Sequence, residues 1–442
     1  MKRSTVANIL AAVILAIPAG TSAEIEHEEA VLTSGIFTPS DSGFFGSRFG
    51  SAVGLGSSWL AASAPYYDVG GAITEDLGIV LNYVPGEAGW QQTFSWTCYE
   101  FNSSNSCGGS GPTLGHSLAL GQDEDGGFHL VIGRTRASGQ FGPVAAMIEF
   151  FSNDGDGSWD FSIPVASEDS VLDFPYPQFG ASVAASGEGL EPTALVGVPV
   201  ESTIRIVPLD GGETTTMAPD GDVSNFGRAV AIHGDRAVVG SSSGVYLLTR
   251  SAGSPDFAIA ATIAPPDGSG GFGASLALRG STLLVGAPST VGEEGADVGT
   301  GYLYDFEDPG DPLHVFEAPD PAFRERLGWA VALGESFAAL SAPGGDGSIE
   351  LGSLDGRVLI FDLESGELHS ELQLETPDDG DYFGGSIDAD GLTVVVGAPL
   401  TNDERGAVYL FTVPAPEPGA LSAALVALAT LALRARSRLR PS

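Results

Sequence analysis

Few side chains in this 442-residue chain have the types and spacing that catalysis requires. No serine lies in a Gly-x-Ser-x-Gly elbow with supporting context. The 57 aspartates and glutamates must bring some carboxylates together by composition alone, so a glycosidase-like pair stays an alternative. The six histidines are scattered without metal-ligand spacing: His27, His116, His129, His233, His314 and His369. We therefore expect a protein that is not an enzyme.

Calcium binding is the sharper chemical hypothesis. A calcium loop needs Asp or Asn oxygens at alternating positions and a glycine at its sharp turn. Two acidic segments have part of this pattern, Asp123-Glu124-Asp125-Gly126 and Asn153-Asp154-Gly155-Asp156-Gly157 with Asp160. The first lacks the remaining ligands, and each can equally be an ordinary acidic turn. We expect no cofactor, with Ca²⁺ as the alternative.

The two cysteines, Cys98 and Cys107, lie close together in one segment. In an oxidising compartment such a pair forms a local disulfide, which is our expectation. Two free thiols are the alternative. A metal site would need more ligands than this pair supplies.

A repeat organises the whole chain. A Phe-Gly or Leu-Gly pair opens an apolar stretch that ends at a glycine or serine, often within Gly-Ala-Pro or Ser-Ala-Pro. The pairs begin at Phe49, Leu114, Phe179, Phe226, Phe272, Leu327 and Phe383, and the stops are Ser63, Gly133, Gly197, Gly240, Gly286, Ser341 and Gly397. This period of about 45 to 65 residues is typical of stacked supersecondary units.

Each repeat except the last contains the pattern of four strands. An alternating run such as Ala229–Ile232 is followed by a Gly-Asp type turn and then by a continuous apolar run such as Val394–Val396. A third strand starts at a glycine, and a fourth precedes the next Phe-Gly pair. The pattern predicts an all-β, seven-bladed β-propeller over residues 29–413. The last repeat has no room for its fourth strand, so we expect the N-terminal segment Val31–Pro39 to pair into the last blade and close the ring.

The repeats resemble FG-GAP repeats, the units of the integrin α-subunit propeller, and more closely the short bacterial form without its calcium loop. The resemblance covers roughly residues 31 to 413 and is specific because the motif recurs in order. The second and third repeats depart most, since Gly133-Arg134-Thr135 and Gly197-Val198-Pro199 replace Gly-Ala-Pro. The resemblance implies a role in adhesion or in an extracellular polymer layer.

Both ends of the chain have the composition of export signals. Residues 1–23 combine Lys2-Arg3, a short apolar run and a small-residue cleavage site after Ala23, which predicts a secretory signal peptide; an uncleaved anchor is the alternative. Residues 414–442 contain Pro416-Glu417-Pro418, an apolar run and four arginines. This order resembles the PEP-CTERM sorting signal of Gram-negative bacteria. The resemblance implies processing by an exosortase-like membrane enzyme and display at the cell surface or in the extracellular matrix, with a permanent C-terminal membrane anchor as the alternative.

The formal net charge of −39 limits the classes of partner. The only lysine, Lys2, lies in the expected signal peptide, so the exported chain is still more acidic. Such a surface repels nucleic acid and anionic lipid, and we expect neither as a partner. An acidic surface would attract divalent cations or cationic surfaces. Alternatively, the acidity is an adaptation to a saline habitat.

The loops after the small-residue stops differ most from one repeat to the next, and we expect them to form the binding surface. They include Tyr66-Tyr67-Asp68, Ser289–Gly299 and Gly344–Gly352, where aromatic side chains could stack on sugar rings. We expect an exported, surface-displayed, non-catalytic protein that binds an extracellular protein or polysaccharide, or that forms part of the matrix. The alternatives are a carbohydrate-binding or glycan-processing propeller and a calcium-dependent adhesion module.

Overall fold

The structure is a computed structural model. It describes residues 24–26, 30–32, 47–66, 78–86, 89–97, 114–122, 127–134, 138–139, 142–143, 147–153, 160–166, 180–187, 192–251, 254, 256–292, 297–322, 324–344, 356–374 and 380–414. The signal cleavage site at Ala23, the pair Cys98 and Cys107, and the motif Pro416-Glu417-Pro418 lie outside these ranges.

The described strands form antiparallel sheets of successive chain segments. The first sheet has β3 (Val53–Gly56), β4 (Trp59–Ala64), β5 (Ile79–Gly86) and β6 (Gly89–Thr97). The next has β7 (Leu114–Gln122), β8 (Phe128–Arg134), β11 (Met147–Asn153) and β12 (Asp160–Ala166), with the short pair β9 (Ser138–Gly139) and β10 (Gly142–Pro143) between β8 and β11. Then come β13 (Val183–Ser186), β14 (Thr193–Val198), β15 (Thr203–Pro208) and β16 (Thr215–Met217).

The same order continues through the second half of the chain. One sheet has β17 (Val230–His233), β18 (Arg236–Ser241), β19 (Gly244–Arg250) and β20 (Phe257–Ile263). Another has β21 (Ser275–Arg279), β22 (Thr282–Ala287), β23 (Thr300–Asp305) and β24 (His314–Phe316). They are followed by β25 (Val331–Leu333), β26 (Phe337–Ala342), β27 (Arg357–Asp362) and β28 (Leu368–Leu372), and finally by β29 (Ser386–Asp390), β30 (Thr393–Ala398) and β31 (Ala407–Thr412), with helix α2 (Thr401–Glu404) before β31.

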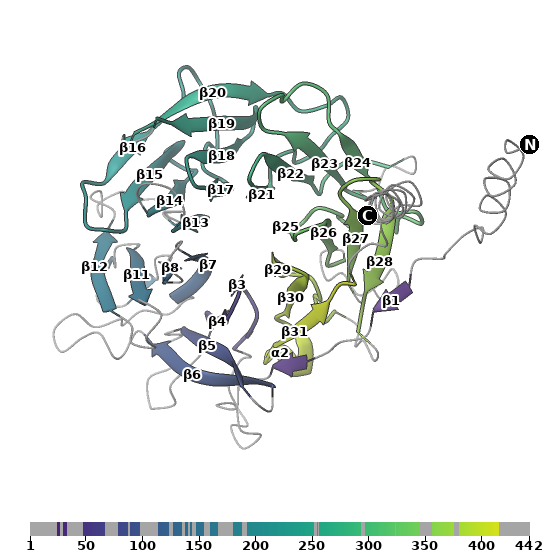
Figure 1. Ribbon diagram of the computed structural model, residues 1–442, viewed down its shortest axis with the longest axis horizontal. Helices are drawn as coiled ribbons and strands as arrows, with labels where there is room; N and C mark the ends of the chain where they lie inside the picture. The colour runs from purple at the N-terminus through teal and green to yellow at the C-terminus, as the bar shows by residue number, and fades with distance from the viewer. Residues whose placement is uncertain are drawn as a thin grey trace, which may run out of the picture.

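The sheets stand around a central axis in chain order, with the first strand of each innermost (Figure 1). Each innermost strand packs beside the innermost strand of the next sheet, and β29 packs beside β3. The expected all-β propeller is confirmed. Its expected division into seven four-stranded blades needs correction, because the described strands give six four-stranded sheets. The sheet of β25–β28 has a fifth strand, β1 (Glu24–Glu26), which runs parallel to β28.

The N-terminal segment therefore contacts two neighbouring sheets. β2 (Ala30–Leu32) pairs antiparallel with β31, from Ala30 opposite Leu410 to Leu32 opposite Val408. This pairing includes only the start of the segment Val31–Pro39, and residues 33–46 lie outside the described part. The parallel pairing of β1 was not expected from the sequence. It has a simple physical reason: β28 is an outer strand whose edge N–H and C=O groups need partners.

The glycines of the motif explain why it recurs. Gly328 of one Leu-Gly pair has a φ of 84°, and a Cβ there would lie 2.8 Å from the carbonyl oxygen of Thr300 in the preceding sheet. The stop glycine Gly286 lies on the other side of the same contact. A Cβ on Gly286 would lie 2.2 Å from the carbonyl oxygen of Gly328. The two motif glycines of successive repeats thus allow the backbones of adjacent sheets to touch.

A hydroxyl group usually completes this contact between sheets. Where the stop is glycine, a serine three residues after the Phe or Leu usually donates to the carbonyl oxygen of the next motif glycine. These bonds are Ser117 to Gly180 at 2.6 Å, Ser182 to Gly227 at 2.8 Å, Ser275 to Gly328 at 2.7 Å and Ser386 to Gly50 at 2.9 Å. Where the stop is Ser63 or Ser341, that position is alanine, and the stop hydroxyl accepts from the amide of Ala52 or Ala330. In the remaining repeat Arg228 donates to the carbonyl oxygen of Gly273.

The core lies between adjacent sheets. Phe226, Phe272 and Phe383 are buried and pack edge-on against aromatic rings of the third strand of their own sheet. Phe272 also belongs to a cluster that includes Val238 and Val245 of the preceding sheet. The motif phenylalanines thus form part of the core between sheets. Burying rings of this size is a large stabilising contribution for each seam between sheets.

Candidate binding site

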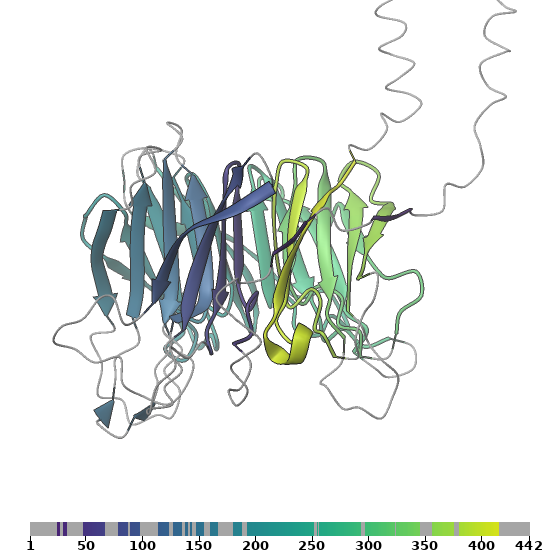
Figure 2. The same ribbon diagram turned by 90° about the horizontal axis from the view of Figure 1, so that it is seen from below.

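The innermost strands begin at one end of the ring, which we call the Phe-Gly end; in Figure 2 it is the lower side, where α2 lies. Where the residue before a Phe-Gly or Leu-Gly pair is itself described, its φ is positive. At this position stand Arg48, Asn225, Gly271, Arg326 and Tyr382. A left-handed backbone is unfavourable for arginine and tyrosine, so the chain keeps these side chains at a position where glycine or asparagine would be easier.

Arg326, Trp329 and Tyr382 form a guanidinium–aromatic cluster at the Phe-Gly end. The guanidinium carbon of Arg326 lies 5.9 Å from the Trp329 ring centre, and the rings of Trp329 and Tyr382 lie 6.0 Å apart in an edge-on arrangement. Trp329 is 37% exposed, although most large apolar side chains of the described residues are buried. Burial raises the pKa of the Tyr382 hydroxyl, and the charge of Arg326 opposes this shift. The cluster joins the sheet of β25–β28 to the sheet of β29–β31.

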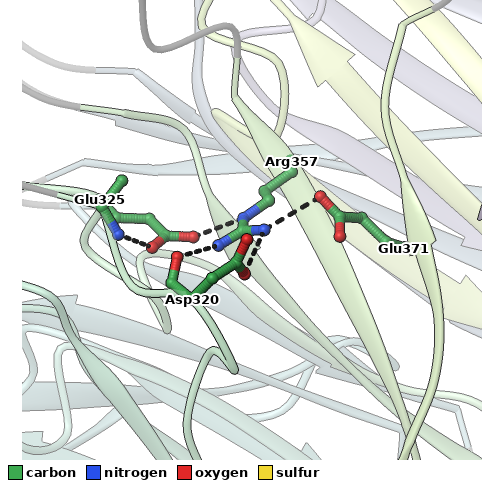
Figure 3. A network of polar contacts seen from close by, with 5 residues as sticks. Asp320, Glu325, Arg357 and Glu371 are labelled. Carbon is green, nitrogen blue, oxygen red and sulfur yellow. Dashed lines mark hydrogen bonds and ion pairs between the residues drawn. The ribbon is translucent and has the colours of Figure 1, made fainter. Parts of the chain in front are cut away.

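An arginine network holds the loop that carries Arg326 (Figure 3). Arg357, at the start of β27, donates from Nε to Glu325 Oε1 at 2.6 Å, and its Nη1 lies 3.2 Å from Asp320 Oδ1 and 3.1 Å from Glu371 Oε1. Glu325 is 2% exposed and also accepts from the amide of Ala322 at 2.7 Å. Asp320 and Glu325 are therefore held in place shortly before Arg326.

The charges of this network support one another. Burial alone would lower the pKa of Arg357, but the hydrogen bond and charge of Glu325, together with Glu371, raise it. Because the guanidinium stays charged, the buried carboxylate of Glu325 keeps its counter-ion. The network thus gives the cluster a rigid support, since its charges stabilise one loop conformation.

The second feature is the central channel, which has a volume of about 430 Å³ and is lined by the innermost strands. The position five residues after each Phe or Leu of the motif faces the next sheet. In six repeats it holds a small residue: Gly54, Ala119, Ala184, Ala231, Ala277 and Ala332. A Cβ on Gly54 would lie 2.6 Å from Leu118 of the neighbouring sheet, which shows why the position is small. In the last repeat the same position is Asp388.

Asp388 lies at the seam between β29 and β3. Its Oδ2 accepts from the amide of Leu55 at 2.8 Å, and its Oδ1 accepts from the amide of Ala389 at 2.8 Å. Part of the residue faces the channel, but the neighbouring sheet encloses the carboxylate. Burial raises the pKa of Asp388 to about 6; the two backbone hydrogen bonds oppose the shift, and the charge of Asp390 adds to it. A polar group therefore replaces an apolar contact at this seam alone.

Several residues singled out from the sequence are described but do not form one site. Tyr66 lies under the guanidinium of Arg48, with the guanidinium carbon 4.7 Å from the ring centre. Five histidines lie on β7, β8, β17, β24 and β28. Within the described ranges no three His, Cys, Asp or Glu side chains have an arrangement that could hold a metal ion. The same part of the chain contains no helix that is long and apolar enough to cross a membrane.

Other expected residues lie outside the described part. These are Tyr67, Asp68, the segment Asp123–Gly126, the centre of Asn153–Asp160, residues 293–296 and residues 345–352. The guanidinium–aromatic cluster was missed from the sequence. An alignment of the repeats would have indicated it, because Arg326 and Tyr382 precede the motif and Trp329 follows Leu327-Gly328.

Comparisons with known proteins support the fold and one repeat. Residues 376–411 match the FG-GAP repeat family, which confirms the resemblance in the last repeat. No curated protein matches the chain. A solved structure titled "Structure of U3-55K" is similar with a TM-score of 0.50 and 10% identity, over 82% of this chain and 95% of that chain. Kluyveromyces lactis Hsv2 has a TM-score of 0.40 and 10% identity, over 68% of this chain and 76% of that chain. The U3-55K similarity concerns the fold alone.

Proposed function

We propose that this propeller with an FG-GAP repeat is an exported, surface-displayed, non-catalytic protein that binds an extracellular polymer or protein in adhesion or in the matrix. The observation that carries the proposal is the guanidinium–aromatic cluster of Arg326, Trp329 and Tyr382. An exposed ring beside a cation on a rigid frame is suited to recognition. The distribution of the described histidines over several strands favours binding over catalysis.

Export is part of the same proposal. Residues 1–23 would be removed after Ala23, Cys98 and Cys107 would form a disulfide, and the tail from Pro416 would be processed by an exosortase-like enzyme. The sequence patterns at both ends support this, and so does the acidity of the chain, which suits a solvated extracellular surface.

The framework of the proposal is a closed ring of sheets, in which β2 is the outer strand of the last sheet. The pairing of β2 with β31 supports this closure, as do the contacts of Ser386 with Gly50 and of Asp388 with Leu55. A rigid ring would hold the cluster without any change of shape on binding.

Cell-surface labelling tests the proposal. The full-length chain is expressed in a Gram-negative host that carries an exosortase. Intact cells are treated with a membrane-impermeant biotin hydrazide and a carbodiimide, which label carboxylates, because the only lysine, Lys2, would be removed with the signal peptide. We expect the chain to be labelled and to be recovered with the extracellular polymer fraction. An unlabelled chain in the cytoplasm would contradict export, and a labelled chain that never associates with polymer or protein would contradict the binding role.

A further inference from the structure

Three polar groups of the cluster at the Phe-Gly end have no partner within the described residues. No hydrogen bond there involves the guanidinium of Arg326, the indole N–H of Trp329 or the hydroxyl of Tyr382, and no described carboxylate pairs with Arg326. By contrast, Arg48, which stands at the equivalent position of the first repeat, is paired with Glu404 at 3.0 Å. The cluster thus presents donors and an aromatic face together.

The acidity of the chain repels a polyanion at long range, so an acidic sugar can be bound only at short range, through a cation that the carboxylates of the described residues leave unpaired. With a formal net charge of −39, a surface arginine has many carboxylates available as partners. Arg326 instead stacks near Trp329, and the neighbouring Glu325 is used entirely by Arg357 and the Ala322 amide. Among the described residues, the charge of Arg326 is therefore left for an external anion. A planar guanidinium binds a carboxylate through two parallel hydrogen bonds.

We infer that Arg326, Trp329 and Tyr382 form a binding site for an acidic sugar, a uronate residue of an extracellular polysaccharide. The apolar face of the pyranose ring packs on the exposed indole, and its carboxylate binds the guanidinium of Arg326. The indole N–H and the Tyr382 hydroxyl are donors for the ring hydroxyls. This inference rests on the proposed function and names the class of polymer that the protein recognises.

The ring and the charge are both needed for this assignment. A neutral sugar would use the indole but not the cation, and a simple anion would use the cation but not the indole. The contacts of Arg357 with Asp320 and Glu325 favour a preformed site, because ordering of long side chains on binding otherwise reduces affinity.

Binding measurements on the full-length protein in mild detergent test the inference. The probes are polygalacturonate, neutral dextran of similar length, and poly-glutamate as a polyanion without sugar rings. We expect binding to polygalacturonate, and affinity that falls about tenfold or more for both Trp329→Ala and Arg326→Gln, because each removes one charge-assisted or stacking contact. Arg48→Gln is the matched control, since it removes a guanidinium beside an aromatic ring at the equivalent position, and we expect affinity within about twofold of wild type.

The outcomes distinguish a failure of the acidic-sugar site from a failure of the proposed binding function. Equal binding to dextran, or an unchanged affinity of Arg326→Gln, overturns the acidic-sugar assignment. Equal binding to poly-glutamate overturns the role of the ring. If polygalacturonate binds but neither Trp329→Ala nor Arg326→Gln weakens it, the site is wrong while the binding function stands. Thermal unfolding of each variant separates a lost contact from a lost fold.

Discussion

The contact between Gly286, Ser275 and Gly328 predicts a specific coupling between two substitutions. Ser275 Oγ donates to the carbonyl oxygen of Gly328 at 2.7 Å, and a Cβ on Gly286 would lie 2.1 Å from that Oγ and 2.2 Å from that carbonyl oxygen. Gly286→Ser therefore forces two adjacent sheets apart. Overpacking of this kind costs about 1–3 kcal/mol, and Ser275→Ala alone costs about 0.5–1.5 kcal/mol through the lost hydrogen bond.

The double variant reproduces the arrangement that the protein already uses at Ser341 and Ala330. Ser275→Ala removes one of the two clashes of Gly286→Ser. The new hydroxyl at position 286 can then accept from the amide of residue 275, as Ser341 Oγ accepts from the amide of Ala330 at 2.9 Å. We expect the two changes to be coupled favourably by about 1 kcal/mol or more. The carbonyl oxygen of Gly328 remains close, so the double variant stays less stable than wild type.

Urea denaturation followed by tryptophan fluorescence measures this coupling. The four proteins of the cycle are compared by their midpoints, with the slope of the transition checked for a change in mechanism. The reverse exchange, Ser341→Gly with Ala330→Ser, is the second cycle, and its double variant should lie within about 1 kcal/mol of wild type. Additivity within about 0.3–0.5 kcal/mol in both cycles would refute the reasoning.

Three further predictions follow from single residues. The pKa of Asp388 is about 6 in the folded protein and lower in the unfolded chain. The folded state is therefore stabilised by the protonated carboxyl below about pH 4, and this stabilisation is lost as the pH rises through about 6. Asp388→Ala should flatten the pH dependence of thermal unfolding in this interval. Arg357→Gln leaves the buried carboxylate of Glu325 without its counter-ion and should lower the free energy of unfolding by about 3–5 kcal/mol, measured by urea denaturation. Gly328→Ala should destabilise by clearly more than Gly391→Ala in a thermal scan, because both glycines have positive φ but only Gly328 has backbone atoms of another sheet within 3 Å of the new Cβ.

The controls come from the repeats themselves. Alanine at position 388 is the residue that most other repeats carry, so it is expected to pack without strain. If thermal unfolding of Asp388→Ala has the same pH dependence as wild type, the Asp388 carboxyl is not the group that titrates. Glu325→Gln with Arg357→Gln should be less damaging than Arg357→Gln alone, since no buried charge then remains; equal damage would show that packing, not charge, matters there.

Much of the fold could be predicted from local sequence. The alternation in β17, the continuous apolar run of β30 and the turn at Gly234-Asp235 are local patterns, and the structure has strands and a hairpin at these places. The stop residues and the Phe-Gly pairs repeat because each makes the same contact with the next sheet. The parallel strand β1 had no such pattern, since three residues pair there with an edge that exists only in the assembled ring.

The candidate site was less accessible to prediction. The loops after the stop residues were expected to carry it, but the cluster of the described part lies where the chain enters the innermost strands. Arg326 and Trp329 are close in sequence, whereas Tyr382 belongs to the next sheet, and its ring meets Trp329 only because the two repeats stand side by side.

The amino-acid sequence by itself determined the repeat, the strands within it and the small residues between sheets, because strand periodicity, turn residues and close backbone approaches are set by neighbours along the chain. Only the tertiary structure decided which side chains meet across the seams. Asp388 accepts from Leu55 across 333 positions of sequence, and Arg357 holds Glu325 across 32. No local pattern specifies such partners, because they are brought together by the curvature of the ring.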